Sequence, residues 1–246
     1  KQESLKRPTD ALDHHMVFSN RTESNTTFFA VQKAFEGNFS YDIFLDSGSS
    51  SPDAKLHPEN LTHLLASYKK EHDEHFESRF GLIKSGMHAN HVEAAREITS
   101  QLIGGIGYYY GESLVDRRPL NDSGMYLHDM HGAMPKPEGP HSLLTATPSR
   151  SFFPRGFYWD EGFHLLHIGA WDAELASMIF GSWTHLMDKN GWVAREQILG
   201  EEARSQVPRE FQTQYPQHAN PPTLIFGLNS MLDEYCLLYT SDAADE

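Results

Sequence analysis

The stretch from Ser151 to His164 reads S-F-F-P-R-G-F-Y-W-D-E-G-F-H. It places two adjacent carboxylates, Asp160 and Glu161, among six aromatic side chains and five residues after Arg155. Aromatic faces can cover the apolar face of a sugar ring, while carboxylates bind its hydroxyls or protonate its glycosidic oxygen. A buried aromatic cluster with a solvated Asp-Glu pair at a helix start would give the same pattern. From composition alone, the second interpretation is the more common one.

Composition limits the classes of function that the chain can serve. Its 246 residues allow one large domain or slightly more, and an apolar content of 39% is enough for a core. The formal net charge of -14, with no basic stripe, argues against binding to nucleic acid or to anionic membrane surfaces. No apolar run approaches the ~18 residues of a membrane-spanning helix, and no signal peptide opens the chain. The first residue is Lys1 rather than Met, so we expect the natural N terminus further upstream.

Sequons of the form Asn-x-Ser/Thr occur five times. The candidate glycosylation sites are Asn20, Asn25, Asn38, Asn60 and Asn121. Single sequons are common by chance, but five of them favour the lumen of the secretory pathway over the cytosol. A polar surface rich in Asn, Ser and Thr is the alternative explanation.

The chain has one cysteine, Cys236, so no disulfide can form within it. The segment from Cys236 to Glu246 reads C-L-L-Y-T-S-D-A-A-D-E and resembles one reading frame of a transposon-end sequencing adapter. We therefore expect the native sequence to end at Tyr235, and residues 236–246 are excluded from the fold prediction as a non-native, adapter-derived tail.

The N-terminal part has the residue types of β-structure. Phe28–Gln32 and Phe39–Leu45 predict strands, the second with imperfect alternation. Residues 47–58 are rich in Ser, Gly, Pro and Asp and predict a loop. Residues 1–58 therefore resemble the end of a β-sandwich whose earlier part is absent.

Helical patterns dominate from residue 60 onward. Apolar spacing predicts helices over residues 61–79, 91–110, 161–180 and 173–187, and from 223 onward. A break is expected near Trp171–Asp172. The proline-containing stretch 117–150 predicts a loop, and 191–217 an irregular segment with a short strand or turn at 192–194. This order fits a ring of helix pairs with active-site loops, although a generic all-α domain would produce the same pattern.

Three blocks of this sequence resemble the signature of glycoside hydrolase family sixty-three, the family of the processing α-glucosidases I or mannosyl-oligosaccharide glucosidases. The first block is Ser151–His164. The second, Gly191–Pro222, reads G-W-V-A-R-E-Q-I-L-G-E-E-A-R-S-Q-V-P-R-E-F-Q-T-Q-Y-P-Q-H-A-N-P-P, and the third, Leu102–Gly111, reads L-I-G-G-I-G-Y-Y-Y-G. The blocks keep the family's order and approximate spacing, and the resemblance covers roughly Phe76 to Tyr235.

The resemblance implies a mainly α fold, with part of an (α/α)6 barrel catalytic domain preceded by the end of an N-terminal β-sandwich domain. On this basis the chain divides into residues 1–58, the end of the sandwich, and residues 59–90, a helical linker. Residues 91–235 would then be the N-terminal part of the catalytic domain, followed by the tail 236–246.

The family hydrolyses the terminal α-1,2-linked glucose of the triglucosylated N-glycan precursor with inversion of configuration. Inversion needs two carboxyls about 6.5 to 9.5 Å apart, one as the acid and the other as the base that activates water. Asp160 matches the family's general acid, and Phe157 and Trp159 would reduce its hydration and favour its protonated form. Glu161 is its nearest rival for this role.

The same matching implies which residues bind the sugar. The general base is expected beyond Tyr235, so this chain would hold half of the catalytic pair; Glu196 and Glu201 are less favoured as the base. The substrate-binding candidates are Phe153, Arg155, Trp159, Glu161, Trp192, Arg195, Glu196, Gln197 and Glu201, with Gln214 and Asn220 as weaker ones. Arg155 has a structural salt bridge as an equal alternative. His164, one turn after Asp160, has a structural role as its more common alternative.

Three other interpretations stay open. Glu161 and His164 form a Glu-x-x-His unit of the kind found in metal-binding bundles, but no zinc motif occurs, and we expect neither a metal nor a cofactor. A non-catalytic carbohydrate-binding or truncated inactive isoform would keep the aromatic site without turnover. A related (α/α)6 α-glycosidase, such as a trehalase-like enzyme, would act on another substrate.

The sequons and the Arg195–Pro222 part of the second block favour the processing enzyme over the related α-glycosidase. Its partner would be the glucosylated high-mannose N-glycan of nascent glycoproteins in the lumen of the endoplasmic reticulum. The resemblance also implies a single-pass membrane anchor that lies outside this chain.

Overall fold

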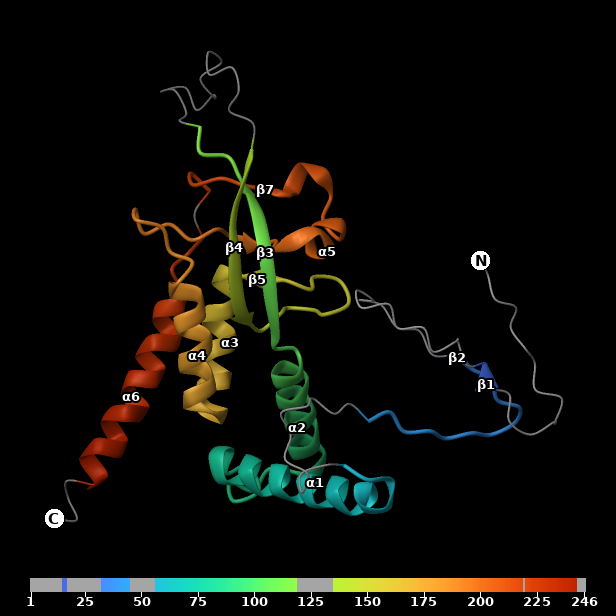
Figure 1. Ribbon diagram of the computed structural model, residues 1–246. Coiled ribbons are helices and arrows are strands. Elements are labelled where there is room, and N and C mark those ends of the chain that lie inside the picture. Colours follow the sequence, from blue (N-terminus) through green and yellow to red (C-terminus); the bar gives the residue numbers. More distant parts are fainter. Residues whose placement is uncertain (1–14, 17–31, 45–55, 119–134, 219, 243–246) are drawn as a thin grey trace. The chain divides into compact units, whose positions relative to one another are not determined.

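The computed structural model describes residues 15–16, 32–44, 56–118, 135–218 and 220–242. Its contacts divide the chain into two units, residues 1–68 and 69–246, and helix α1 (Pro58–Phe80) begins in the first and ends in the second. Helices hold more of the described residues than strands do (Figure 1). The fold is therefore mainly α, as the sequence predicts, while the barrel and the β-sandwich stay predictions.

The first unit contains one short antiparallel pairing among its described residues. Strand β1 (His15–Met16) pairs there with β2 (Gln32–Lys33). Residues 28–31 of the predicted strand Phe28–Gln32 lie outside the described residues.

The predicted strand over residues 39–45 is wrong for the described residues 39–44, which are exposed and carry no strand. The rings of Phe39 and Tyr41 stack instead on Phe35, with centroids 4.2 and 5.6 Å from its ring. A strand needs a neighbour that takes up its backbone hydrogen bonds. Alternating aromatic residues alone do not supply one, so the pattern produced local stacking without a sheet.

The second unit has its elements in the following order after the end of α1. They are α2 (Ala89–Gly104), β3 (Gly107–Val115), β4 (Lys136–Thr145), β5 (Gly156–Phe157), α3 (Tyr158–Trp171), α4 (Ala173–Thr184), β6 (Glu196–Gln197), α5 (Gly200–Ser205), the 3-10 turn η2 (Arg209–Phe211), β7 (Thr213–Gln214) and α6 (Leu224–Asp242). The predicted helices exist, with changed boundaries. The predicted break between two of them lies at Asp172, whose carboxylate caps α4 by accepting from the Leu175 N–H at 2.9 Å.

A long antiparallel hairpin of β3 and β4 corrects two predictions (Figure 1). The helix expected to reach Tyr110 ends at Gly104, and the loop expected over 117–150 contains β4. Glycine at 104, 105 and 107 weakens the helix, and the tyrosines that follow favour a strand. Strand β4 lies at the edge of the sheet order β4-β3-β7, where Pro137 and Pro140 need no donor for a further strand.

Helices α3, α4 and α6 pack together around the main hydrophobic core (Figure 1). Leu165 of α3 and Trp183 of α4 are fully buried, and the Trp183 indole donates to Thr145 Oγ1 at 3.1 Å, tying α4 to the end of β4. A Cβ atom added at Gly162 would lie 2.2 Å from the carbonyl carbon of Thr223. Glycine at 162 therefore lets the start of α3 approach the chain just before α6 more closely than any side chain would allow.

The C-terminal end of α3 is held by the later part of α1 and by α2. Arg79 Nε donates to the Ala170 carbonyl at 2.6 Å, and His75 Nε2 lies 3.2 Å from the Trp171 carbonyl oxygen. These contacts satisfy carbonyls that a helix end leaves without intrahelical partners.

Candidate active site

Asp160 and Glu161 lie in the first turn of α3. The N-cap residue Phe157 supplies no side-chain hydrogen bond, and the Tyr158 N–H donates to the Arg195 carbonyl at 3.0 Å. Carboxylates are stabilised at this end of a helix because the positive end of the helix dipole lies there. Asp160 is half-buried, and its carboxyl has no hydrogen-bond partner among the described residues. It is therefore free to meet a ligand.

The β5–β6 pairing joins the first sequence block to the second. Arg155, directly before β5, is buried, and its Nε donates to Glu196 Oε2 at 2.9 Å. The same guanidinium lies over the rings of Phe157 and Phe153, 4.9 and 5.5 Å from their centroids. Of the two roles predicted for Arg155, the structure contains the salt bridge. Removing one partner of such a pair leaves an uncompensated buried charge, so the pair fixes the geometry of this junction.

The neighbours of Glu196 are held by hydrogen bonds to the backbone. The Glu196 N–H donates to Gln214 Oε1 at 3.0 Å, and Gln197 Nε2 donates to the Ala194 carbonyl at 3.1 Å. Gln197 and Gln214 are both buried. The Arg195 side chain, in contrast, is 58% exposed and lies 4.0 Å from the Glu196 carboxylate. Among these candidate ligands, Arg195 is the one that a sugar in solution can reach.

Glu161 is placed differently from its neighbour Asp160. It is 0% exposed; Oε1 accepts from the Ala146 N–H at 3.1 Å, and Oε2 lies 3.0 Å from His164 Nδ1. The expectation that Glu161 binds a sugar hydroxyl or rivals Asp160 as the acid is at odds with this placement, because no sugar reaches a fully buried carboxylate. The sequence did not reveal the difference, since adjacent helix positions differ only in which way they face.

An exposed aromatic wall lies next to Asp160 in the chain. Trp159 is 45% exposed, and its ring meets that of Phe163 edge-on at a centroid distance of 5.9 Å. Phe163 lies 6.2 Å from Phe226 of α6. Phe153, the other predicted stacking residue of this block, is also about half exposed. The sequence did not single out Phe226 because its proximity depends on the packing of α6 against α3.

Trp192, the predicted stacking residue of the second block, lies under a cation that the sequence analysis missed. The Arg117 guanidinium is 5.1 Å from the centroid of the Trp192 ring. Arg117 Nε donates to Glu138 at 2.6 Å and Nη1 to Asp188 at 2.7 Å. These hydrogen bonds, that to Glu138 first, raise the pKa of Arg117 above its ordinary value. One face of Trp192 is therefore occupied by a permanent charge.

Several buried donors have no hydrogen-bond partner within the described part of the chain. They are Arg96 Nε, Arg155 Nη1, Trp192 Nε1, Arg204 Nε and Asn220 Nδ2. Three of these atoms belong to predicted sugar-binding residues. A buried donor without an acceptor costs about 1–3 kcal/mol, and groups of this kind call for a functional or structural explanation.

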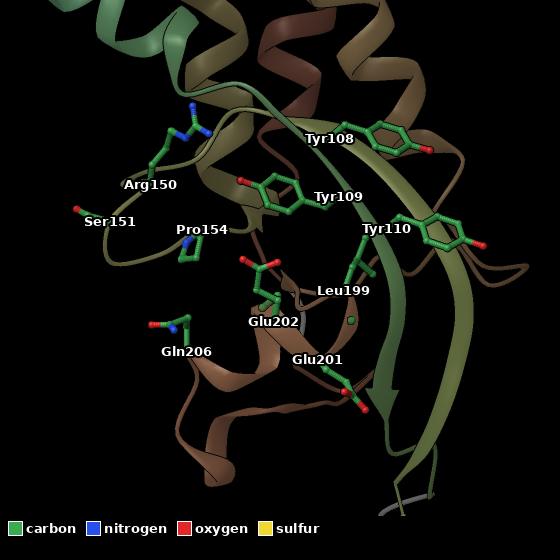
Figure 2. Close-up of a pocket in the computed structure, with 12 residues that line it drawn as sticks. Tyr108, Tyr109, Tyr110, Arg150, Ser151, Pro154, Leu199, Glu201, Glu202 and Gln206 are labelled. Atoms are coloured by element: carbon green, nitrogen blue, oxygen red, sulfur yellow. The ribbon is translucent and has the colours of Figure 1, made fainter. Parts of the chain in front are cut away.

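A cavity of about 630 Å³ brings residues of all three sequence blocks together (Figure 2). Its lining consists of Tyr108, Tyr109, Tyr110, Arg150, Ser151, Pro154, Leu199, Gly200, Glu201, Glu202, Ala203 and Gln206. Figure 2 shows the Tyr109 ring on the same side of β3 as Arg150 and Glu202, opposite to the Tyr108 and Tyr110 rings. Burial raises the pKa of the Tyr109 phenol above its ordinary value. Glu201 is a predicted ligand in this lining, whereas Asp160 is not part of it.

Among the described residues, no group of three or more His, Cys, Asp or Glu side chains is placed to hold a metal ion. Glu161 and His164, the strongest sequence pair for a metal site, bond each other. Of the sequons, Asn38 and Asn60 are exposed, and Asn20, Asn25 and Asn121 lie outside the described residues. No helix in the described part of the chain is long and apolar enough to cross a membrane.

Three curated relatives resemble the chain over most of its length. Mannosyl-oligosaccharide glucosidase of Saccharomyces cerevisiae is 40% identical over 242 residues, covering 94% of this chain and 29% of the yeast protein. The probable mannosyl-oligosaccharide glucosidase of Schizosaccharomyces pombe is 41% identical, covering 82% of this chain and 26% of that protein. Mannosyl-oligosaccharide glucosidase GCS1 of Arabidopsis thaliana is 36% identical, covering 89% and 26%. The chain thus spans 26 to 29% of the length of these relatives.

The family model of the glycosyl hydrolase family 63 C-terminal domain matches residues 56–245. This match includes all three sequence blocks, the Asp160 helix and the β5–β6 junction. It also runs through residues 236–245, so the non-native origin of the tail stays a prediction. The chain belongs to glycosyl hydrolase family 63, of whose C-terminal domain it contains a part.

Proposed function

We propose that this chain carries the general-acid half of an inverting α-glucosidase that removes the terminal α-1,2-linked glucose from the triglucosylated N-glycan precursor. The observation that carries the proposal is the placement of Asp160. It is a half-buried carboxyl without a hydrogen-bond partner among the described residues, at the start of a helix whose position the Arg155–Glu196 pair fixes. The names of three relatives, all mannosyl-oligosaccharide glucosidases, support the substrate.

In this mechanism Asp160 donates its proton to the glycosidic oxygen as the bond from that oxygen to the anomeric carbon breaks. Water attacks the opposite face of the sugar, and its proton passes to a second carboxylate. Two carboxylates near Asp160 in the fold are disfavoured for that second role. Glu161 is buried, and Glu196 would have to give up its ion pair with Arg155 to accept a proton. The reaction needs only two carboxyls and water, so no cofactor is proposed.

Sugar binding is proposed for the exposed and unpaired groups near Asp160. Trp159 and Phe163 offer ring faces to the apolar side of a glucose residue. Arg195, whose side chain is 58% exposed, offers hydrogen bonds to hydroxyls. The cavity lined by Tyr109, with its mixture of phenol, carboxylate and guanidinium groups, would hold a further part of the glycan.

The proposed setting is the lumen of the endoplasmic reticulum, with the N-glycan of nascent glycoproteins as the partner. The exposed sequon residues Asn38 and Asn60 support a compartment in which N-glycosylation occurs. A membrane anchor outside this chain is part of the same proposal.

The test measures glucose release from a triglucosylated N-glycan by the longest natural polypeptide that contains residues 1–235 of this sequence. We expect release by the wild type and a loss of about 10²-fold or more in kcat for Asp160→Asn, with unchanged thermal unfolding. Near-normal turnover by the variant would remove Asp160 from its role. Glucose release from trehalose instead of the N-glycan would favour a trehalase-like enzyme. Glycan binding without release by the wild type would favour a non-catalytic carbohydrate-binding protein.

A further inference from the structure

Three exposed aromatic rings gather in the first unit, ahead of the residues that the family model matches. Phe35, Phe39 and Tyr41 are 43%, 59% and 51% exposed, and none of them belongs to a helix or strand. The Phe35 and Phe39 rings stack at a centroid distance of 4.2 Å, and the Tyr41 ring lies 5.6 and 6.1 Å from them. Single exposed apolar residues need no explanation, but a gathered group such as this aromatic cluster indicates contact with another molecule or group.

A glycosylation sequon runs through the aromatic cluster. It is Asn38-Phe39-Ser40, so the acceptor residue directly precedes one ring of the cluster and follows Phe35 by three positions. The chain bends at residues 37–38, and Gly37 has a φ of +84°, which glycine adopts at little cost. A Cβ atom added at Gly37 would meet no atom within 4 Å. The acceptor therefore lies in an exposed bend with open space beside it.

The two described sequon residues differ in how their carboxamides are bound. Asn60 lies in the first turn of α1, where its Oδ1 accepts from the His57 N–H at 3.2 Å. The carboxamide of Asn38 has no hydrogen-bond partner among the described residues. N-linked glycans are attached at sequons in surface loops. Asn38 is therefore the better acceptor of the two.

We propose that Asn38 carries an N-linked glycan whose first sugar packs on the aromatic cluster. In the attachment, a bond forms between Asn38 Nδ2 and the anomeric carbon of that sugar. The bond from this carbon to the diphosphate of a lipid-linked oligosaccharide donor breaks, and the nitrogen loses one proton to solvent. The apolar face of the attached sugar then covers aromatic surface that water would otherwise contact. This inference rests on the luminal setting of the proposed function and not on the role of Asp160.

The first experiment measures which sequons carry a glycan. The longest natural polypeptide that contains residues 1–235 is produced in eukaryotic cells, and the glycan at each sequon is detected by mass spectrometry of its peptides. We expect most molecules to carry a glycan at Asn38 and a smaller fraction to carry one at Asn60. Ser40→Ala removes the sequon while it keeps Asn38 and all three rings, so it should lose the Asn38 glycan alone.

The second experiment measures the packing of the first sugar by the rate at which chymotrypsin cleaves after Tyr41. Endoglycosidase H trims a high-mannose glycan to its first sugar, which removes steric shielding by the outer sugars. We expect this single-sugar form to be cleaved about fivefold more slowly than Ser40→Ala, an effect of the size of one aromatic contact.

Two further variants separate packing on the rings from mere attachment of a sugar. Phe35→Ala keeps the sequon but removes a ring of the aromatic cluster, so the protection by the single sugar should disappear. Ile43→Ala is the matched control, because Ile43 is 83% exposed and lies outside the aromatic cluster, and it should keep the protection. Each variant is compared with the same variant that also carries Ser40→Ala.

Two results would overturn the proposal while the luminal setting stays in place. One is an unmodified Asn38 in protein that carries a glycan at Asn60, and the other is equal cleavage of the single-sugar form and Ser40→Ala. Protein without a glycan at any sequon would overturn both this proposal and the luminal setting. Glucose release is measured separately, so a failure of the proposed reaction is distinguishable from all of these results.

Discussion

The two ends of α3 differ in whether their polar groups have hydrogen-bond partners. At the C-terminal end, the Ala170 and Trp171 carbonyls contact Arg79 and His75, and His167 contacts Thr99. At the N-terminal end, the carboxyl of Asp160 and the Nη1 donor of Arg155 have no hydrogen-bond partner among the described residues.

This difference is informative because both ends belong to one helix in one hydrophobic core. A buried donor without an acceptor costs stability, so the unpaired Arg155 Nη1 indicates that this end is used for something other than packing. The C-terminal end of α3 attaches the helix to α1 and α2. The N-terminal end exposes the Asp160 carboxyl to a ligand. Substitutions at the two ends should therefore change different measurable properties.

The largest expected effect on stability comes from the N-terminal junction. Arg155→Met removes the buried cation from Glu196, whose side chain is 14% exposed and keeps only the exposed Arg195 at 4.0 Å. We expect a loss of about 3 kcal/mol in the free energy of unfolding, measured in urea. The control is Lys69→Met, which breaks the largely exposed pair with Asp73 and should cost less than about 1 kcal/mol. If the two variants lose equal stability, breaking the Arg155–Glu196 pair does not leave an uncompensated buried charge.

Gly162→Ala should follow with a loss of about 1–3 kcal/mol, because its Cβ would meet the backbone of Thr223. Gly181→Ala in α4 is the matched control; an added Cβ there has no atom within 4 Å, and the higher helix propensity of alanine should stabilise by up to about 1 kcal/mol. Urea unfolding measures both. A Gly162→Ala variant as stable as the wild type would contradict the close approach of α3 to the segment before α6.

Thr99→Val tests the docking end and should have a smaller effect. It removes the hydroxyl that contacts His167, and we expect a loss of about 1 kcal/mol with no change in kcat. A fall in kcat larger than about threefold, measured on the glycan substrate, would contradict the proposal that the C-terminal end of α3 serves stability and not catalysis.

The docking end should also show the weakest effect, a dependence of stability on pH. Burial lowers the pKa of His167 below its ordinary value, so the folded chain binds this proton less readily than the unfolded chain does. Stability from this group is present above pH of about 6.5 and falls as the pH drops through the window down to the folded pKa. His167→Asn should reduce the fall in melting temperature between pH 7 and pH 5. An unchanged fall would show that other groups cause it.

The helical part of the fold was predictable because its signals are local. The break at Asp172 coincides with a capping side chain, and the apolar spacing of α3 and α4 continues on either side of it. The hairpin was not predictable from the same signals. Pro137 and Pro140 indicate a loop in most contexts, and only the pairing with β3 makes them acceptable at a sheet edge.

The candidate site was predictable in its membership but not in its contacts. The sequence predicted either sugar binding or a structural salt bridge for Arg155 but did not identify Glu196 as its partner, which it bonds across 41 positions of the chain. It also named Glu161 as the nearest rival of Asp160, and burial separates the two carboxyls. Both differences depend on contacts between elements that are distant in the sequence. The residue spacing within one helix or strand does not predict such contacts.

The most direct test of Asp160 as the general acid uses a substrate that does not need one. Fluoride leaves from α-D-glucosyl fluoride without being protonated, so an enzyme without its acid should still hydrolyse this compound. For Asp160→Asn we expect a loss of about 10²-fold or more in kcat on the glucosylated N-glycan and less than about tenfold on the fluoride. An equally large loss on both substrates would contradict the general-acid role and would give Asp160 another function in the site.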